Sequence, residues 1–225
     1  TGNTVDLRAL TGDITQDQFV RADNLRANAV TGNVVLNGRI ANVASMDTDN
    51  NVAVVSGAAG QSFAYTDADN LQVGTTRAAL SNTTPAGIAA GVTIDLRSVA
   101  GALSQTAQGN LTGTNLQASA ATGVVLDTAS NNVVTVAGST TANDFVYKDT
   151  SSLTVGTVAN MAGITAVAGR VSLDSGDVLN QTAEGVIATP GLRTVATNGV
   201  ALATADNNVQ TLAGQTTTQG FAFKN

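Results

Sequence analysis

The sequence predicts an all-β chain wound as a single-stranded parallel β-helix, or β-solenoid, and three observations lead to this fold class. One block of sequence occurs three times along the 225 residues. Short stretches of alternating apolar and polar residues are separated by Gly, Asn, Asp, Ser and Thr, the pattern of short strands joined by turns. The apolar residues are mostly small, and aromatic residues make up 3% of the chain.

The repeated block is the strongest of these observations. Asn50 to Gly57 returns as Asn131 to Gly138 and again as Asn207 to Gly214. Each copy is followed by two aromatic residues spaced two positions apart. The structural repeat positions are Asn51, Asn132, Asn208, Phe63, Phe145 and Phe221. We expect the asparagine pairs at corners of the coil, where a buried side chain can form hydrogen bonds along the stack.

The repeats divide the chain into three modules of one continuous domain. The expected modules are residues 1–90, residues 91–169 and, incomplete, residues 170–225. Gln105 and Gln181 occupy the same place in successive modules and are 76 residues apart, while Gln16 and Gln105 are 89 residues apart. The excess predicts loop insertions in module 1, near 17–45 and 81–85.

The module length sets the dimensions of the winding. Each module holds about four strand-and-turn units, so one coil takes roughly 19 residues and the chain makes about eleven coils. At roughly 4.8 Å between stacked strands, the rod would be on the order of 50 Å long. Ala, Val, Leu and Ile suit the narrow interior of such a coil. An antiparallel sandwich or an up-and-down barrel would also contain many short strands, but neither requires a repeat of this length.

Charge and composition disfavour several functions. The net charge of −6 and the pI near 4.3 argue against nucleic acid and against anionic lipid, because both partners require clustered Lys and Arg. No apolar run approaches the length of a membrane span, so we expect no direct membrane insertion. The absence of Cys and His excludes disulfides, thiolate metal sites, Ser-His-Asp sites and His-ligated metals.

We therefore expect no catalytic residues, no cofactor and no metal site. Carboxylates alone can cleave polysaccharides, and Asp47 with Asp49 and Asp67 with Asp69 form two Asp-x-Asp pairs. In module 2, however, the second aspartate of each pair is replaced by serine. A polar turn-forming residue is therefore sufficient at these positions.

The repeated motifs resemble those of a known family. The Asn-Asn-Val-x-Thr-Val-Ala-Gly block, the Phe-x-Tyr step and the Leu-Thr-Val-Gly-Thr continuation resemble the repeats of filamentous-haemagglutinin-like exoproteins. The likeness covers nearly the whole chain. It implies a right-handed parallel β-helix, export by two-partner secretion from a bacterium, and use as a stalk or an adhesin.

The expected function is that of an extracellular structural or adhesive segment of a large secreted bacterial surface protein. Its partner would be a host or cell-surface receptor or a glycan of unknown identity. Arg21, Arg26 and Arg39 lie in the most irregular part of module 1 and form a candidate interaction surface. Two alternatives stay open. One is an extracellular filament or surface-layer subunit that self-associates end to end through exposed strand edges, and the other is a carboxylate-based polysaccharide-cleaving enzyme.

Overall fold

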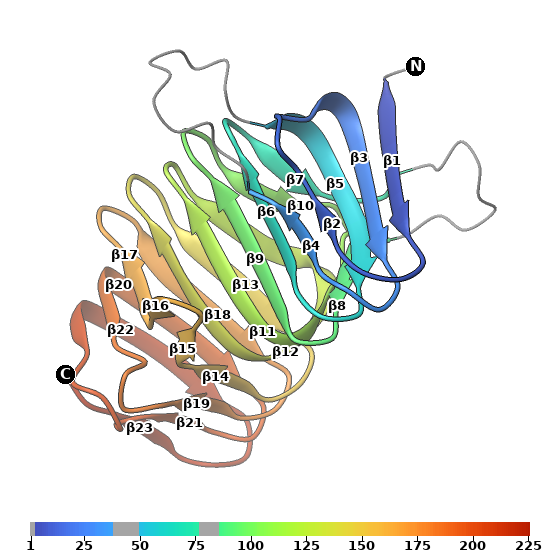
Figure 1. Cartoon of the computed structure of the whole chain (residues 1–225). Coiled ribbons are helices and arrows are strands. Elements are labelled where there is room, and N and C mark those ends of the chain that lie inside the picture. The colour runs from blue at the N-terminus through green and yellow to red at the C-terminus, as the bar shows by residue number, and fades with distance from the viewer. Residues whose placement is uncertain (1–2, 38–49, 77–85) are drawn as a thin grey trace.

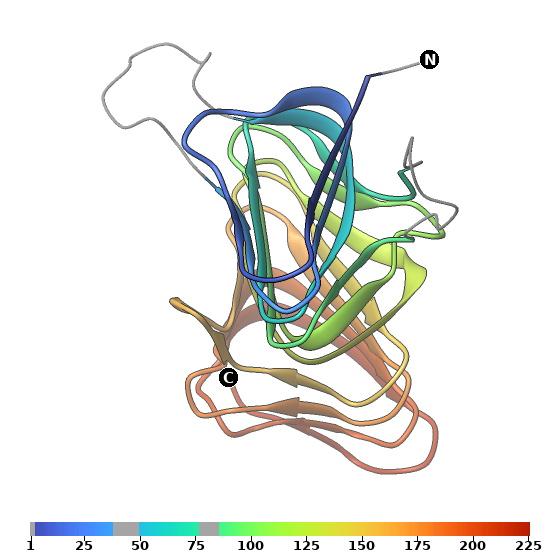
Figure 2. The same ribbon diagram turned by 45° about the vertical axis from the view of Figure 1, so that its right-hand side comes forward.

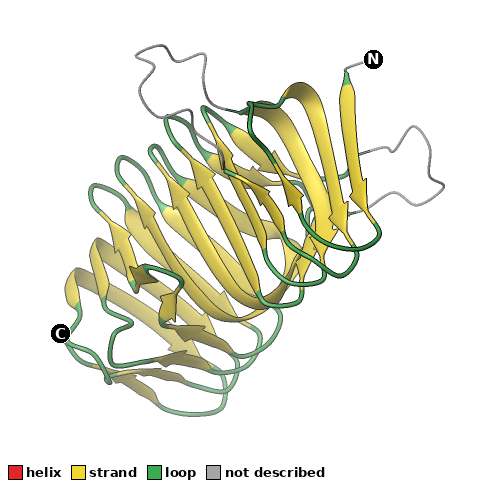
Figure 3. Ribbon diagram, in the orientation of Figure 1, coloured by secondary structure: helices red, strands yellow, loops and turns green. Residues whose placement is uncertain are grey.

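The computed structural model describes residues 3–37, 50–76 and 86–225 of the chain. All regular secondary structure in these residues is β-strand, and no helix occurs among them (Figure 3). The all-β class predicted from the sequence is therefore confirmed.

The described residues form 23 strands. In module 1 they are β1 (Thr4–Ala9), β2 (Ile14–Thr15), β3 (Arg21–Ala29), β4 (Val34–Leu36), β5 (Asn51–Ala59), β6 (Phe63–Asp67), β7 (Leu71–Val73) and β8 (Ile88–Ala90). In module 2 they are β9 (Thr93–Ser98), β10 (Leu103–Gln105), β11 (Leu111–Ala120), β12 (Val124–Thr140), β13 (Phe145–Asp149), β14 (Leu153–Val155), β15 (Thr157–Val158), β16 (Met161–Ala162) and β17 (Ile164–Ala166). In module 3 they are β18 (Arg170–Ser175), β19 (Leu179–Gln181), β20 (Ile187–Ala196), β21 (Val200–Leu202), β22 (Asn208–Thr216) and β23 (Phe221–Phe223).

Successive coils of the chain stack on one another in parallel register. Of the strands, 21 belong to one sheet with parallel pairings, while β15 and β16 pair antiparallel as a small hairpin. The pairings build a first column of ten neighbouring positions: Thr4, Asn24, Val54, Gln72, Ser104, Val125, Val146, Ser172, Arg193 and Ala213. At roughly 4.8 Å per step, this column is about 43 Å long. The chain runs through the stack in sequence order, from the N-terminus at one end to the C-terminus at the other (Figure 1, Figure 2).

A second column alternates with the first along the chain. Its positions include Ile14, Val34, Phe63, Ile94, Leu116, Val136 and Val155. The first copy of the repeated block contains Val54, the third position of the first column. The second copy contains Val136, the sixth position of the second column. The third copy contains Ala213, the tenth position of the first column. A module therefore spans about three and a half coils rather than four, so that equivalent segments of successive modules lie on alternate columns.

The core is a continuous row of buried apolar side chains that runs along the stack. Inward and outward positions alternate, as along β6, where the first, third and fifth residues are buried. Most inward residues are Leu, Val, Ile or Ala, and the largest fully buried side chains are Tyr65, Tyr147, Phe63 and Phe145. Burial of one Leu or Val side chain contributes roughly 1.5–3 kcal/mol, so stability rests on many similar small contributions along the stack.

The structure corrects part of the expected loop insertion near 17–45. Residues 21–36 within that stretch form β3 and β4 and add a full coil, because Leu25, Ala27 and Ala29 point inward. Residues 38–49 and the other expected insertion at 81–85 lie outside the described residues.

Modules 1 and 2 carry an antiparallel pairing at the same place. Thr75 pairs antiparallel with Ala86 in module 1, just as Thr157 pairs with Ala162 in the β15–β16 hairpin of module 2. The hairpin lies on the outside of the stack (Figure 1). The antiparallel pairing at this place is therefore a feature of both modules, and more residues separate the paired positions in module 1.

Candidate functional site

A pair of amide side chains joins neighbouring coils in every module, and both members are buried in modules 2 and 3. The pairs are Gln16 with Asn50, Gln105 with Asn131 and Gln181 with Asn207. In module 2, the Oδ1 of Asn131 accepts from Gln105 Nε2 at 2.5 Å and from the backbone N–H of Leu111 at 3.0 Å. The Nδ2 of Asn131 donates to the carbonyls of Leu126 and Lys148, both at 3.0 Å. One buried side chain therefore satisfies backbone groups on several segments.

The repeat positions Asn51, Asn132 and Asn208 are the second asparagines of these blocks, and all three are exposed. The hydrogen bonding expected along the stack falls on the first asparagine instead, because alternation along the strand turns neighbouring side chains to opposite sides. Asn132 accepts only an exposed hydrogen bond from Ser151 Oγ, at 3.1 Å, among the described contacts.

The aromatic repeat positions pack against the glycine that ends each block. Phe63 and Phe145 are fully buried, whereas Phe221 is 38% exposed. The glycines are Gly57, Gly138 and Gly214, and a Cβ built on any of them would overlap the ring of the following phenylalanine. Glycine and phenylalanine therefore recur together because the ring occupies the space that a side chain would need.

The second aromatic residue of the pair in module 1 is a buried tyrosine, which contacts a buried aspartate two positions later. Tyr65 donates its hydroxyl to Asp67 Oδ2 at 2.7 Å, and the same carboxylate accepts the backbone N–H groups of Val52 at 2.9 Å and Asp69 at 3.1 Å. Burial raises the pKa of Asp67 to about 6 and raises the pKa of Tyr65 above its ordinary value. The tyrosine therefore stays protonated and acts as a donor to the aspartate.

Module 2 repeats this pair, and module 3 replaces both members. Tyr147 donates to Asp149 Oδ2 at 2.9 Å. The equivalent residues of module 3 are Phe223 and Asn225, and Asn225 Oδ1 accepts the backbone N–H of Val209 at 2.8 Å. The hydroxyl donor and the charge disappear together, while the acceptor for the backbone N–H is kept. The pair therefore has a structural role at the corner of the coil.

Two of the three arginines of the candidate interaction surface lie in the described residues, and they differ in exposure. Arg26 is 6% exposed, and its Nη1 lies 3.2 Å from Asp6 Oδ2, so it offers little accessible surface. Arg21 is exposed, with its guanidinium carbon 4.6 Å from the centroid of the Phe19 ring. Arg39 lies outside the described residues. A binding role for this region stays a prediction.

The Asp-x-Asp pair in the described residues does not form a carboxylate pair. Asp67 is fully buried, whereas Asp69 is exposed, because β6 ends at Asp67 and the chain turns there. The other pair, Asp47 and Asp49, lies outside the described residues. Within the described ranges, no group of three or more Asp, Glu, His or Cys side chains is placed to hold a metal ion.

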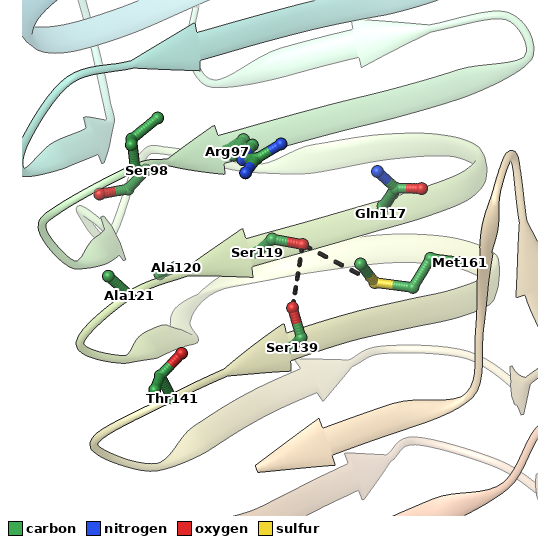
Figure 4. A pocket seen from close by; sticks show the side chains of 10 residues that line it. Arg97, Ser98, Gln117, Ser119, Ala120, Ala121, Ser139, Thr141 and Met161 are labelled. Carbon is green, nitrogen blue, oxygen red and sulfur yellow. Dashed lines mark hydrogen bonds between the residues drawn. The ribbon is translucent and has the colours of Figure 1, made fainter. Parts of the chain in front are cut away.

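A groove beside the β15–β16 hairpin brings together side chains of a different kind. This hairpin groove has a volume of about 280 Å³. Its floor includes Arg97, Ser119 and Ser139, which are neighbours in register on β9, β11 and β12. Gln117 lies on the same strand as Ser119, and Met161 on β16 faces these residues from the hairpin side (Figure 4). The groove is therefore polar on its floor and apolar where the hairpin meets it.

Several polar groups in the hairpin groove are incompletely satisfied. Arg97 is exposed, and its guanidinium makes no hydrogen bond or ion pair with the described residues. Gln117 Nε2 donates to Asp95 Oδ1 at 2.9 Å, but the Oε1 of Gln117 is buried without a partner among the described residues. Ser139 Oγ donates to Ser119 Oγ at 3.4 Å, a long contact (Figure 4). Ser119 Oγ donates to Met161 Sδ at 3.7 Å, and thioether sulfur is a weak acceptor.

Burial raises the pKa of Asp95, next to this groove, while the hydrogen bond from Gln117 and the charge of Arg97 oppose that rise. Asp95 is therefore tied to Gln117, and its attraction to Arg97 does not take the form of an ion pair.

Equivalent positions in the other modules carry a different arrangement. In module 1, Arg26 stands where module 2 has Gln117, and it pairs with Asp6 at 3.2 Å. In module 3, Arg193 stands at this position and pairs with Asp174 at 2.6 Å. Arginine at this place closes an ion pair in both cases. Module 2 departs from the pattern, since glutamine replaces that arginine and a different arginine, Arg97, forms no ion pair with the described residues.

Sequence reasoning did not single out the groove. The Asp-Leu-Arg segments at 6–8 and 95–97 are visible in the sequence, but the residue that stacks beside each one lies about 20 residues later. No family model, curated protein or solved structure matches the chain. In the part of the chain that the structure describes, no helix is long and apolar enough to cross a membrane.

Proposed function

We propose that this chain is a structural or adhesive rod segment of a large secreted bacterial surface protein. In this proposal it is a right-handed β-solenoid of about ten coils, one for each position of the first column, and its outer surface and lateral hairpin are available to a receptor or a glycan. The observation that carries the proposal is the first column, in which ten positions follow one another in parallel register.

The column supports a mechanical role for a physical reason. Each coil hydrogen-bonds to the coils before and after it, so stiffness comes from the backbone and from a continuous core. The outward positions then have few constraints, and the chain can carry excursions such as the β15–β16 hairpin without disturbing the stack. A rod that tolerates lateral additions suits presentation of a binding surface away from a cell.

The test is the shape and assembly state of the purified chain over a concentration series. Small-angle X-ray scattering with analytical ultracentrifugation should give an elongated monomer whose stack is about 43 Å long, from roughly 4.8 Å per step. Beads coated with this monomer should adhere to target cells or to immobilised glycans more than beads coated with an unrelated protein of equal charge.

Other outcomes would change the proposal. Particles that lengthen with concentration by end-to-end association would favour the filament alternative. A compact particle without a long axis would contradict the rod, and elongated monomers without any adhesion would restrict the proposal to a stalk.

A further inference from the structure

We infer that the hairpin groove is a binding site for a carboxylate-bearing sugar, such as a uronic acid unit. The inference deepens the proposed adhesive function by naming a ligand class, and it rests on that function only for its biological setting. Its physical basis lies in one groove, where Arg97 forms no ion pair with the described residues, a buried acceptor has no donor among them, and two hydroxyls are weakly engaged.

Arg97 selects the carboxylate. A guanidinium presents a planar fork of N–H donors that matches a carboxylate in two parallel hydrogen bonds. The Arg97 guanidinium forms no hydrogen bond or ion pair with the described residues, and Asp95 is held by Gln117 at 2.9 Å. The donors of Arg97 are therefore available to a ligand.

The remaining polar groups select hydroxyls. Gln117 Oε1 is buried and has no donor among the described residues. A buried acceptor without a partner destabilises the protein, so a ligand hydroxyl that donates to it would bind favourably. Ser119 and Ser139 face each other at 3.4 Å, so each can exchange this long contact for a better one. A simple carboxylate such as acetate would satisfy Arg97 but would bring no hydroxyl to these three groups.

The size and the wall of the groove fit one sugar ring. A volume of about 280 Å³ is just below the range of roughly 300–1,000 Å³ that is typical of drug-sized ligands. Met161 is half-buried on the hairpin side, and its flexible thioether can pack against the C–H face of a ring. The groove therefore suits a single monosaccharide unit within a longer polymer.

The repeat frame supports a specific role for module 2. In modules 1 and 3 an arginine stands at the position of Gln117 and forms an ion pair. Arg26 pairs with Asp6, and Arg193 pairs with Asp174. In module 2, the glutamine at that place leaves both the Gln117 acceptor and the Arg97 donors available. Arg8 is the residue of module 1 at the position of Arg97. The positions of Ser119 and Ser139 are occupied there by Asn28 and Ala58, so Arg8 provides a matched control.

The experiment uses the methionine methyl groups of the full chain. The chain has two methionines, Met46 and Met161, so ¹³C-methyl labelling gives two NMR signals that a Met161→Leu variant assigns. Methyl glucuronide, methyl glucoside and acetate are titrated separately. We expect a saturable shift of the Met161 signal with the glucuronide in the millimolar range, and at least about tenfold weaker binding of the glucoside and of acetate.

Variants separate the groove from general effects of charge. Arg97→Gln should weaken glucuronide binding at least about tenfold, Arg97→Lys should weaken it less, and Arg8→Gln should leave it unchanged. Equal binding of acetate and glucuronide would overturn the sugar assignment, and loss of binding in Arg8→Gln would overturn the location. A silent Met161 signal would overturn the site, and it would leave the scattering test of the rod untouched, so the two failures are distinguishable.

Discussion

Replacing Asn131 by alanine tests the amide pair that joins neighbouring coils. The substitution removes the acceptor for the backbone N–H of Leu111 and for Gln105 Nε2, which lie 3.0 and 2.5 Å from Asn131 Oδ1. It also removes the donor to the carbonyls of Leu126 and Lys148. All of this takes place around a side chain that is fully buried.

The magnitude follows from the number of groups left without partners. An unsatisfied buried donor or acceptor loses about 1–3 kcal/mol, and water entering the vacated space would recover part of that. We therefore expect Asn131→Ala to lower the free energy of unfolding by about 3–5 kcal/mol. In urea, with a slope of about 2–3 kcal/mol per molar, the midpoint should fall by roughly 1–2.5 M.

The neighbouring asparagine is the control. Asn132 has the same chemistry but is exposed, so Asn132→Ala should change the unfolding free energy by less than about 0.5 kcal/mol. The assay is equilibrium urea unfolding followed by circular dichroism, with the slopes compared because a stacked chain can unfold in parts. Equal effects of the two substitutions would refute the assignment of the bonding role to the first asparagine of each block.

Three further predictions concern the positions around this pair. Gly138→Ala should destabilise the chain by about 1–3 kcal/mol because the new methyl overlaps a buried phenylalanine ring. Gly220→Ala should be nearly neutral in the same urea assay, because its new methyl would meet no atom within 4 Å. Tyr147→Phe should lower the free energy of unfolding by about 1.5–3 kcal/mol, because it removes a donor to a buried carboxylate. Adding Asp149→Asn should restore most of this stability, because module 3 carries Phe223 with Asn225 at these positions. Thermal unfolding of the single and double variants measures both effects. Burial raises the pKa of Asp67 to about 6, above its ordinary value near 3.8. This carboxyl group therefore stabilises the folded state most at low pH, and its contribution should disappear as the pH rises through 6. Asp67→Asn should remove this part of the pH dependence, which urea titrations at about pH 4 and 7 measure.

The repeat and the strands could be predicted from the sequence, because periodic apolar residues and turn-forming residues are local signals. Alternation in segments such as Phe63 to Asp67 directly indicates which side chains are inward. The winding within a module was less accessible. The extra length of module 1 predicts an inserted loop over residues 21–36, but an added coil lengthens a module just as a loop does, and the spacing alone does not distinguish them.

The contacts between coils depend on register, which the sequence does not state. The repeat identifies the asparagines as corner residues, but which of Asn131 and Asn132 points inward depends on the phase of the strand. The Tyr147–Asp149 pair could have been found from the joint change to Phe223 and Asn225 in module 3.

The hairpin groove could not have been found in this way. Arg97 and Gln117 line one groove only because a parallel coil of 22 residues places Ser119 beside Arg97 and Gln117 beside Asp95. A one-residue change in that register would turn one of the two side chains inward.

The central claim is that the chain stacks in parallel register along one column, and distances between spin labels test it most directly. The chain has no native cysteine, so pairs of introduced cysteines report single distances. With one label at Ala213→Cys, the partners Val125→Cys, Gln72→Cys and Asn24→Cys lie four, six and eight steps away along the first column. At about 4.8 Å per step, double electron–electron resonance should give backbone separations of about 19, 29 and 38 Å, increasing in proportion to the number of steps. Distances that fail to increase in this order would contradict the stack.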